Sequence, residues 1–124
     1  MNENPARRYI ENAQLITCIV ERGRADEVVR AALKAGAPAA TIYFARGSGI
    51  RERLGLLFKI AISPEKEVID IVAPQGSADA IFEAMVQAGQ IELPGKGFIY
   101  MVPVSRAMTH LPSPEEDAHI KMRK

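Results

Sequence analysis

Two short glycine clusters contain the residues of this chain whose types and spacing suit ligand binding. They read Arg46-Gly47-Ser48-Gly49 and Pro94-Gly95-Lys96-Gly97. Glycines beside a cation let backbone N–H groups approach phosphate oxygens without steric obstruction. The clusters therefore indicate an anion site, although a Gly-Lys-Gly triplet is also common in plain turns.

The residue types needed for catalysis are poorly placed. His110 and His119 lie at or within the C-terminal tail, and the sequence pairs neither of them with a nucleophile. No Cys/His cluster has metal-ligand spacing, and the single cysteine, Cys18, lies in an apolar run typical of a small buried side chain. We therefore expect a non-enzymatic protein without a metal site or a covalent cofactor.

The composition further limits the kinds of protein that this chain can be. The 124 residues carry a formal net charge of +1 and are 48% hydrophobic, which is typical of one globular domain. That charge argues against a nucleic-acid binder, because phosphate affinity needs several clustered cations. No secretory leader is recognisable, and no apolar run approaches the roughly 18 residues of a spanning helix. We expect a soluble, cytoplasmic protein that can still dock on a membrane protein.

An internal repeat organises the chain. Residues 16–36 align without a gap on residues 69–89, at a constant offset of 53. Each copy is followed by an apolar run, residues 41–44 and 98–101, at an offset of 57. The repeated unit is therefore strand, helix, strand, and the second copy has four extra residues before its last strand, where the Gly95-Lys96-Gly97 cluster lies.

The residue patterns give this unit its elements. Branched apolar runs predict strands over 15–20 and 69–73, and stripes at helical spacing predict helices near 25–33 and 78–86. Ser77 is a suitable N-cap, and Gly36 and Gly89 fall where left-handed C-terminal caps are expected. The expected fold is α+β and ferredoxin-like. It has an antiparallel four-stranded sheet, the first and third strands central, and both helices on one face.

Two features of this fold point to assembly. The sheet face opposite the helices would be exposed to solvent in a single copy, yet the strands carry apolar residues on both sides. The simplest way to bury that apolar face is contact with a second copy of the chain. The two glycine clusters would lie at edges of the sheet, where neighbouring subunits could bring them together.

The segment 47–66 is an insertion that the fold does not need, and long insertions are usually functional. Within it, 56–62 could form a strand and Pro64-Glu65 a turn; the alternative to a functional insertion is an extra hairpin used only for packing or oligomerisation. We divide the chain into an N-terminal extension (1–14), a domain (15–110) and a proline-broken, charged tail (111–124).

With these residues in place, the chain resembles the P-II signal-transduction family, small cytoplasmic homotrimers of double strand–helix–strand subunits. The resemblance runs from Leu15 to Thr109. Segment 15–20 resembles the first strand of the family, 41–49 the second strand with its Gly-x-Gly, and 88–101 the B-loop and the strand after it. The insertion stands in place of the T-loop, which touches partner proteins in the family.

The resemblance implies a site and partners. An adenine nucleotide (ATP, ADP or AMP) would be the effector, bound between subunits, and the regulated partner would be a membrane transporter or a metabolic enzyme. The implied nucleotide-binding residues are Gly47, Ser48, Gly49, Gly89, Gln90, Gly95, Lys96, Gly97 and Arg106. The implied partner-binding residues are Ile50, Arg51, Glu52, Arg53 and Leu54.

The chain also departs from the nitrogen-regulatory members of that family. Segment 47–66 has no tyrosine for uridylylation and no glutamine for binding Mg-ATP and 2-oxoglutarate. The Gly-Asp-Gly-Lys of the family reads Gly95-Lys96-Gly97-Phe98, and only Arg106 stands where the family has several arginines. Two alternatives stay open. One is a ferredoxin-like trimer that binds a metal or inorganic ion, and the other is a purely structural assembly module.

Overall fold

The computed structural model describes residues 8–47 and 65–109. In chain order the elements are β1 (Arg8–Tyr9), β2 (Gln14–Glu21), α1 (Ala25–Lys34), β3 (Thr41–Arg46), β4 (Glu65–Ala73), α3 (Ala78–Gly89), β5 (Gly97–Pro103) and β6 (Met108–Thr109). None of the described helices is long and apolar enough to cross a membrane.

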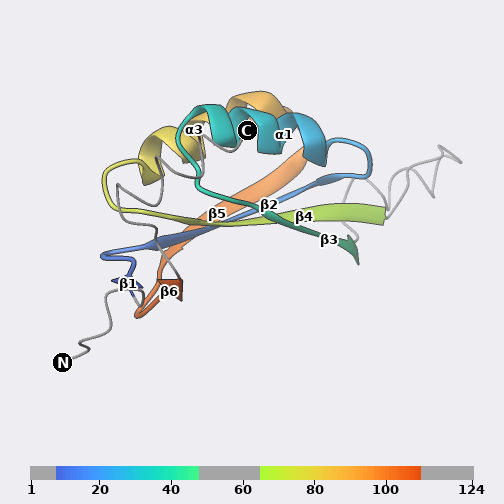
Figure 1. The fold of residues 1–124 in the computed structure, drawn as a ribbon. Coiled ribbons are helices and arrows are strands. Elements are labelled where there is room, and N and C mark those ends of the chain that lie inside the picture. The colour runs from blue at the N-terminus through green and yellow to red at the C-terminus, as the bar shows by residue number, and fades with distance from the viewer. Residues whose placement is uncertain (1–7, 48–64, 110–124) are drawn as a thin grey trace, which may run out of the picture.

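The main sheet has the order β3-β4-β2-β5, and every neighbouring pair is antiparallel. Helices α1 and α3 pack against each other and cover one face of this sheet (Figure 1). The first and third strands of the repeat, β2 and β4, are central, and β3 and β5 are the edges. The prediction of an α+β, ferredoxin-like fold is confirmed.

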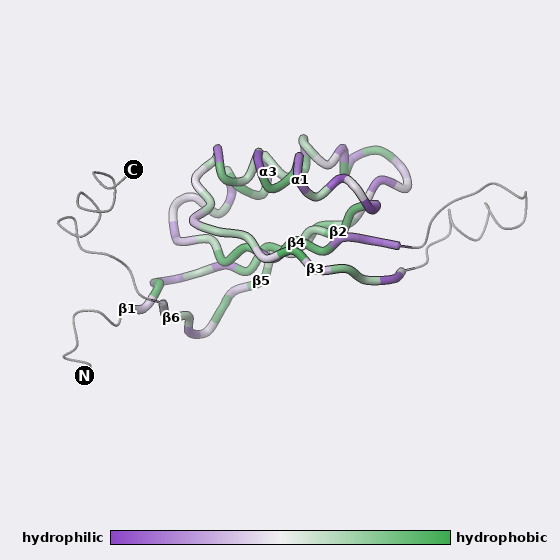
Figure 2. The backbone as a smooth tube through the Cα atoms, turned by 45° about the vertical axis from the view of Figure 1, so that its right-hand side comes forward, coloured by the Kyte–Doolittle hydropathy of each residue, from purple (hydrophilic) through white to green (hydrophobic). Residues whose placement is uncertain are grey.

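The core lies between the sheet and the helices. Strand β2 contributes Ile16, Cys18 and Val20, which alternate with residues on the opposite face, as the two-residue period of a strand requires. The same face of β4 and the inner faces of both helices complete the core with Ile69, Ile71, Ala73, Val28, Ala32, Ile81 and Met85. Burial of each large branched side chain contributes roughly 1.5–3 kcal/mol. Figure 2 shows the apolar strands beneath helices whose outward turns are hydrophilic.

The helix ends confirm part of the capping predictions. Ser77 holds the N-cap position of α3, but its hydroxyl donates to the Pro74 carbonyl at 3.3 Å and does not cap the helix. Gly36 has a φ of +113°, as expected of a left-handed residue after α1. The prediction for Gly89 was wrong. Gly89 belongs to α3, and the left-handed residue is Gln90, with a φ of 54°.

The insertion is shorter than the sequence indicated. Strand β4 starts at Glu65, which is in register with Arg46 of β3, and Lys66 is in register with Ala45. The expected turn at Pro64-Glu65 is therefore wrong for Glu65, because pairing with β3 continues to the end of that strand. The strand expected over 56–62 lies outside the described residues.

A second, two-stranded sheet was not predicted. Strand β1 pairs with β6, and the Ile10 amide donates to the Ala107 carbonyl at 2.9 Å. This small sheet lies at the end of the main sheet where β5 finishes (Figure 1). Residues 8–14, expected in an N-terminal extension, therefore include β1 and the first residue of β2.

Candidate functional site between the glycine segments

The two glycine segments predicted to bind a ligand lie at one end of the main sheet. Strands β2 and β3 finish there, and β4 and β5 start there, because each neighbouring pair is antiparallel. Gly47 follows β3, and the segment Gln90–Lys96 leads into β5. The fold thus places both glycine segments at the same end of the molecule.

The second glycine segment is a wound turn. Beyond α3, Gln90 takes the left-handed conformation, and the Leu93 amide donates to the Gln90 carbonyl at 3.0 Å. The Lys96 amide then donates to the Leu93 carbonyl at 3.3 Å, and Gly95 has a φ of 74°. Lys96 itself is half-buried. This turn fixes the backbone that the resemblance assigns to a phosphate.

Packing explains two of the glycines in this region. A Cβ on Gly97 would lie 2.5 Å from the Ile19 carbonyl oxygen and 2.9 Å from Cδ1 of Ile91. A Cβ on Gly89 would lie 3.0 Å from Cδ1 of Ile91 and 3.4 Å from Cγ2 of Val28. The backbone of β2 therefore leaves no room for a Cβ at Gly97, whereas at Gly89 a Cβ would meet side-chain atoms of Ile91 and Val28 at tight distances.

The first glycine segment is described only at its start. Gly47 packs beside Lys66, whose Cγ would lie 3.7 Å from an added Cβ, an ordinary contact. The other predicted residues of this segment lie outside the described residues, namely Ser48, Gly49, Ile50, Arg51, Glu52, Arg53 and Leu54.

Arg106 is not brought to the glycine segments within one copy of the chain. It follows β5, whose seven residues separate it from Gly97 by about 20 Å or more. Its Nη2 donates to the Tyr9 hydroxyl at 3.0 Å, and its guanidinium lies 5.1 Å from the centre of the Tyr9 ring. The contact of Arg106 with Tyr9, in the short strand β1, was not predicted from the sequence.

The two glycine segments also stay apart within one copy. Strands β3 and β5 are separated by three strand spacings, about 14 Å across the sheet. A ligand the size of a nucleotide phosphate group cannot touch both segments from one side of one copy. A neighbouring copy, offering its opposite edge, would bring unlike segments together.

The sheet face opposite the helices is apolar around its rim. Tyr43 of β3 is 45% exposed, and on β5 Phe98 is 60%, Tyr100 41% and Val102 41% exposed. Register places these residues on the face that Leu15, Thr17 and Ile19 of β2 share, away from the helices. We call this surface the open face. No helix among the described residues covers it (Figure 1).

A polar network lies in the middle of the open face. Thr17 donates to Oδ1 of Asp70 at 2.7 Å, and Tyr43 donates to Oδ2 of the same carboxylate at 3.0 Å. That hydrogen bond is the main cause of a raised Tyr43 pKa, with desolvation and nearby charge adding to it. Thr17 is buried although its side chain lies on the open face of the sheet. Periodicity gave no signal for this network, because its members come from three strands.

Two further kinds of chemical group can be assessed in the described part of the chain, namely metal ligands and the thiol of Cys18. Residues 8–47 and 65–109 bring together no group of three His, Cys, Asp or Glu side chains that could hold a metal ion. Cys18 is fully buried, and desolvation raises the pKa of its thiol to about 12, so it stays protonated and unreactive at neutral pH.

Comparison with known proteins agrees with this architecture. The model of the family "Nitrogen regulatory protein P-II" matches residues 13–111, and this chain therefore belongs to the P-II family. The P-II family is a family of signal-transduction proteins. No curated protein matches the chain at a significant level.

A solved structure shows the same fold. The crystal structure of the PII protein of Arabidopsis thaliana bound to citrate superposes with a TM-score of 0.57 and 21% sequence identity. The match covers 76% of this chain and 78% of the plant chain. At this identity the likeness concerns the fold alone.

Proposed function

We propose that this chain is a cytoplasmic, non-enzymatic P-II signalling protein that assembles as a homotrimer and binds an adenine nucleotide between its subunits. The bound effector controls how the segment 47–66 engages a membrane transporter or a metabolic enzyme. Membership of the P-II family supports the signalling role. The citrate in the plant PII structure supports anionic small molecules as ligands of this fold.

The observation that carries the proposal is the placement of the two glycine segments. They lie at one end of the sheet but at opposite edges, beside an open apolar face. Association through that face would hide exposed aromatic side chains and set the β3 edge of one copy near the β5 edge of the next. The cleft so formed has an edge from each subunit, and neither subunit supplies it alone.

Within the cleft, each residue has a role. The turn from Gly89 through Gln90 to Gly95 and Gly97 presents backbone N–H groups, and Lys96 neutralises phosphate charge. Gly47, Ser48 and Gly49 line the nucleotide from the other subunit. Arg106 contributes only if a neighbouring copy supplies it, because it lies at the far end of β5. Ile50, Arg51, Glu52, Arg53 and Leu54 contact the regulated partner.

Titration calorimetry with ATP, ADP and AMP tests this proposal. We expect at least one nucleotide to bind, and we expect Lys96→Ala to weaken that binding about tenfold or more, because a charge-assisted contact is lost. Lys34→Ala is the matched control, since Lys34 is an exposed lysine at the end of α1. Absence of heat with all three nucleotides would overturn the nucleotide claim, and equal effects of the two substitutions would remove Lys96 from the site.

A further inference from the structure

The turn between β2 and α1 contacts residues beside both candidate segments, at the start of β4 and at the end of α3. We define this coupling turn as the consecutive residues Arg22, Gly23 and Arg24. It lies at the same end of the sheet as the glycine segments, since it follows the last residue of β2. Its backbone is bent by Gly23, which has a φ of +92°.

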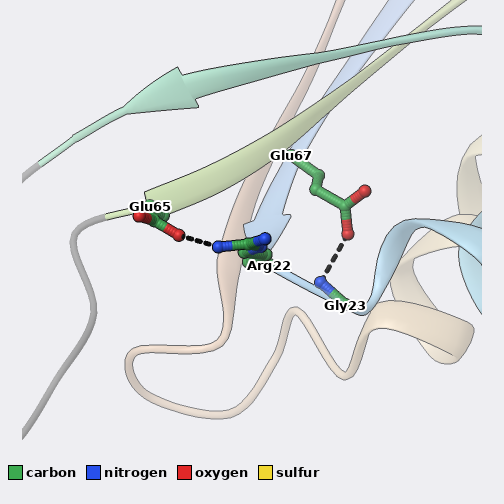
Figure 3. A network of polar contacts seen from close by, with 4 residues as sticks. All are labelled: Arg22, Gly23, Glu65 and Glu67. Carbon is green, nitrogen blue, oxygen red and sulfur yellow. Dashed lines mark hydrogen bonds and ion pairs between the residues drawn. The ribbon is translucent and has the colours of Figure 1, made fainter.

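Two of the turn's residues hold the start of β4. Nη1 of Arg22 forms an ion pair with Oε2 of Glu65 at 2.5 Å, and the Gly23 amide donates to Oε1 of Glu67 at 2.5 Å (Figure 3). The same Glu67 oxygen accepts the Ala25 amide at 3.3 Å. Glu67 therefore caps the N-terminus of α1 in place of a local side chain, since Arg24 at the N-cap makes no capping bond.

The third residue of the turn holds the other segment. Nη2 of Arg24 donates to the Ala88 carbonyl at 3.3 Å, in the last turn of α3. Ala88 stands two residues before Gln90, where the wound turn begins. The Nε of Arg24 is buried and has no hydrogen-bond partner among the described residues, so the link to α3 runs through one terminal nitrogen.

We propose that the coupling turn transmits changes between the Gln90–Lys96 turn and the start of β4. Displacement at the end of α3 moves Arg24, which shifts Gly23 and Arg22 and thereby the anchored carboxylates of Glu67 and Glu65. A signalling role for the coupling turn rests on the proposed function, in which the segment 47–66 contacts the regulated partner. Strand β4 begins at the end of that segment, so a shift at the start of β4 would reach it. Arg24 is a positioning residue that acts through the Ala88 carbonyl.

Coupling is reciprocal, so loss of either contact must increase the opening of the backbone at the other contact. Hydrogen exchange measured by mass spectrometry on the ligand-free protein tests this with two substitutions. We expect Arg24→Met to raise exchange about threefold at 65–68, and Glu67→Ala to raise exchange about threefold at 89–97, because each removes a charge-assisted bond. Arg24→Lys, which keeps a cationic donor, restores most of the protection at 65–68.

Two controls separate coupling from general destabilisation. The centre of β2, residues 16–19, reports global opening and must keep its wild-type exchange in both variants. Arg30→Met removes an exposed arginine from α1 and should leave both segments unchanged. If each substitution alters exchange only beside its own contact, or if exchange rises equally at 16–19, the proposal is overturned.

The same measurement with ATP separates the two proposals. ATP protection of 89–97 without reciprocal effects of the substitutions would contradict the coupling turn and leave the nucleotide site standing. Reciprocal effects in the ligand-free protein together with no response to ATP would support the coupling turn and contradict ATP as the effector.

Discussion

The two halves of the repeat share strand, helix and strand, but they close differently after the helix. In the first half the chain turns at Gly36 and the Ala37 amide returns to the Ala32 carbonyl at 2.9 Å. In the second half the equivalent glycine, Gly89, remains helical, and the left-handed turn falls one position later at Gln90.

This difference gives the second half a longer connection after its helix, and that connection is one of the two candidate segments. Helix α3 runs two residues further than α1 in the aligned repeat and ends at Gly89, where an added Cβ would lie 3.0 Å from Cδ1 of Ile91 and 3.4 Å from Cγ2 of Val28. The extra residues then wind into a turn that ends on Gly97, pressed against β2. The first half has a short connection and an insertion after β3 instead. Each half therefore offers one candidate segment, at opposite edges of one sheet end.

The largest expected effect concerns the equivalent tyrosines of the two halves, Tyr43 and Tyr100. Tyr43 donates to Asp70, whereas Tyr100 presents its ring on the open face with 41% exposure. Tyr100→Glu should abolish the proposed trimer, because three carboxylates would be desolvated where its subunits meet. Light scattering after gel filtration measures this. Leu33→Glu, at a similarly exposed site (47%) on α1, is the control and should keep the wild-type mass.

Gly97 and Gly47 border the two candidate segments and should differ sharply. Gly97→Ala should lower the free energy of unfolding by about 2–4 kcal/mol, because the new Cβ would meet the Ile19 carbonyl oxygen at 2.5 Å. Gly47→Ala meets only the Lys66 side chain at 3.7 Å and should change it by less than about 0.5 kcal/mol. Urea unfolding of both variants compares them; equal losses would show that β5 does not press on β2 as described.

The left-handed residues that follow the two helices, Gly36 and Gln90, give smaller effects on stability, and the two effects have opposite signs. Gly36→Ala places a Cβ at a φ of +113° and should destabilise by about 1–2 kcal/mol. Gln90→Gly relieves a non-glycine residue at a φ of 54° and should stabilise by up to about 1 kcal/mol. Thermal unfolding measures both changes. A destabilised Gln90→Gly variant would mean that the Gln90 side chain contributes more than its backbone strain costs.

An effect seen only at high pH distinguishes Cys18 from its repeat equivalent, Ile71, since both are fully buried but only one titrates. Burial raises the pKa of the folded thiol from its ordinary value of 9.0 to about 12, so ionisation favours the unfolded chain above pH 9. The wild-type free energy of unfolding should therefore fall, relative to Cys18→Ala, by about 1 kcal/mol per pH unit from pH 9 upward. Urea unfolding at pH 8 and pH 10 measures it. Identical pH dependence in both proteins would contradict the burial of the thiol.

Much of the fold could be predicted from the sequence. The offset of 53 between the halves places β2 with β4 and α1 with α3, and the apolar stripes identify the buried helix faces. That information is local and periodic, so periodicity captures it. Strands of two residues such as β1 and β6 carry no such period, which is why their pairing was missed.

The site was less predictable because its contacts join residues distant in sequence. Glu67 caps α1 from 42 to 44 residues away, and Thr17 reaches Asp70 across 53 residues. No spacing rule connects such pairs before the strand register is known. Composition also did not distinguish Gly97, which packing requires, from Gly47, which it does not.

Native mass spectrometry of the wild-type chain with ADP tests the central claim most directly. We expect a species of about 41 kDa, three copies of the 13.6 kDa chain, that carries up to three nucleotides. We also expect the single copy to bind none, because neither sheet edge alone completes the cleft. Nucleotide bound to the lone 13.6 kDa chain, or a trimer that remains empty at saturating ADP, would contradict it.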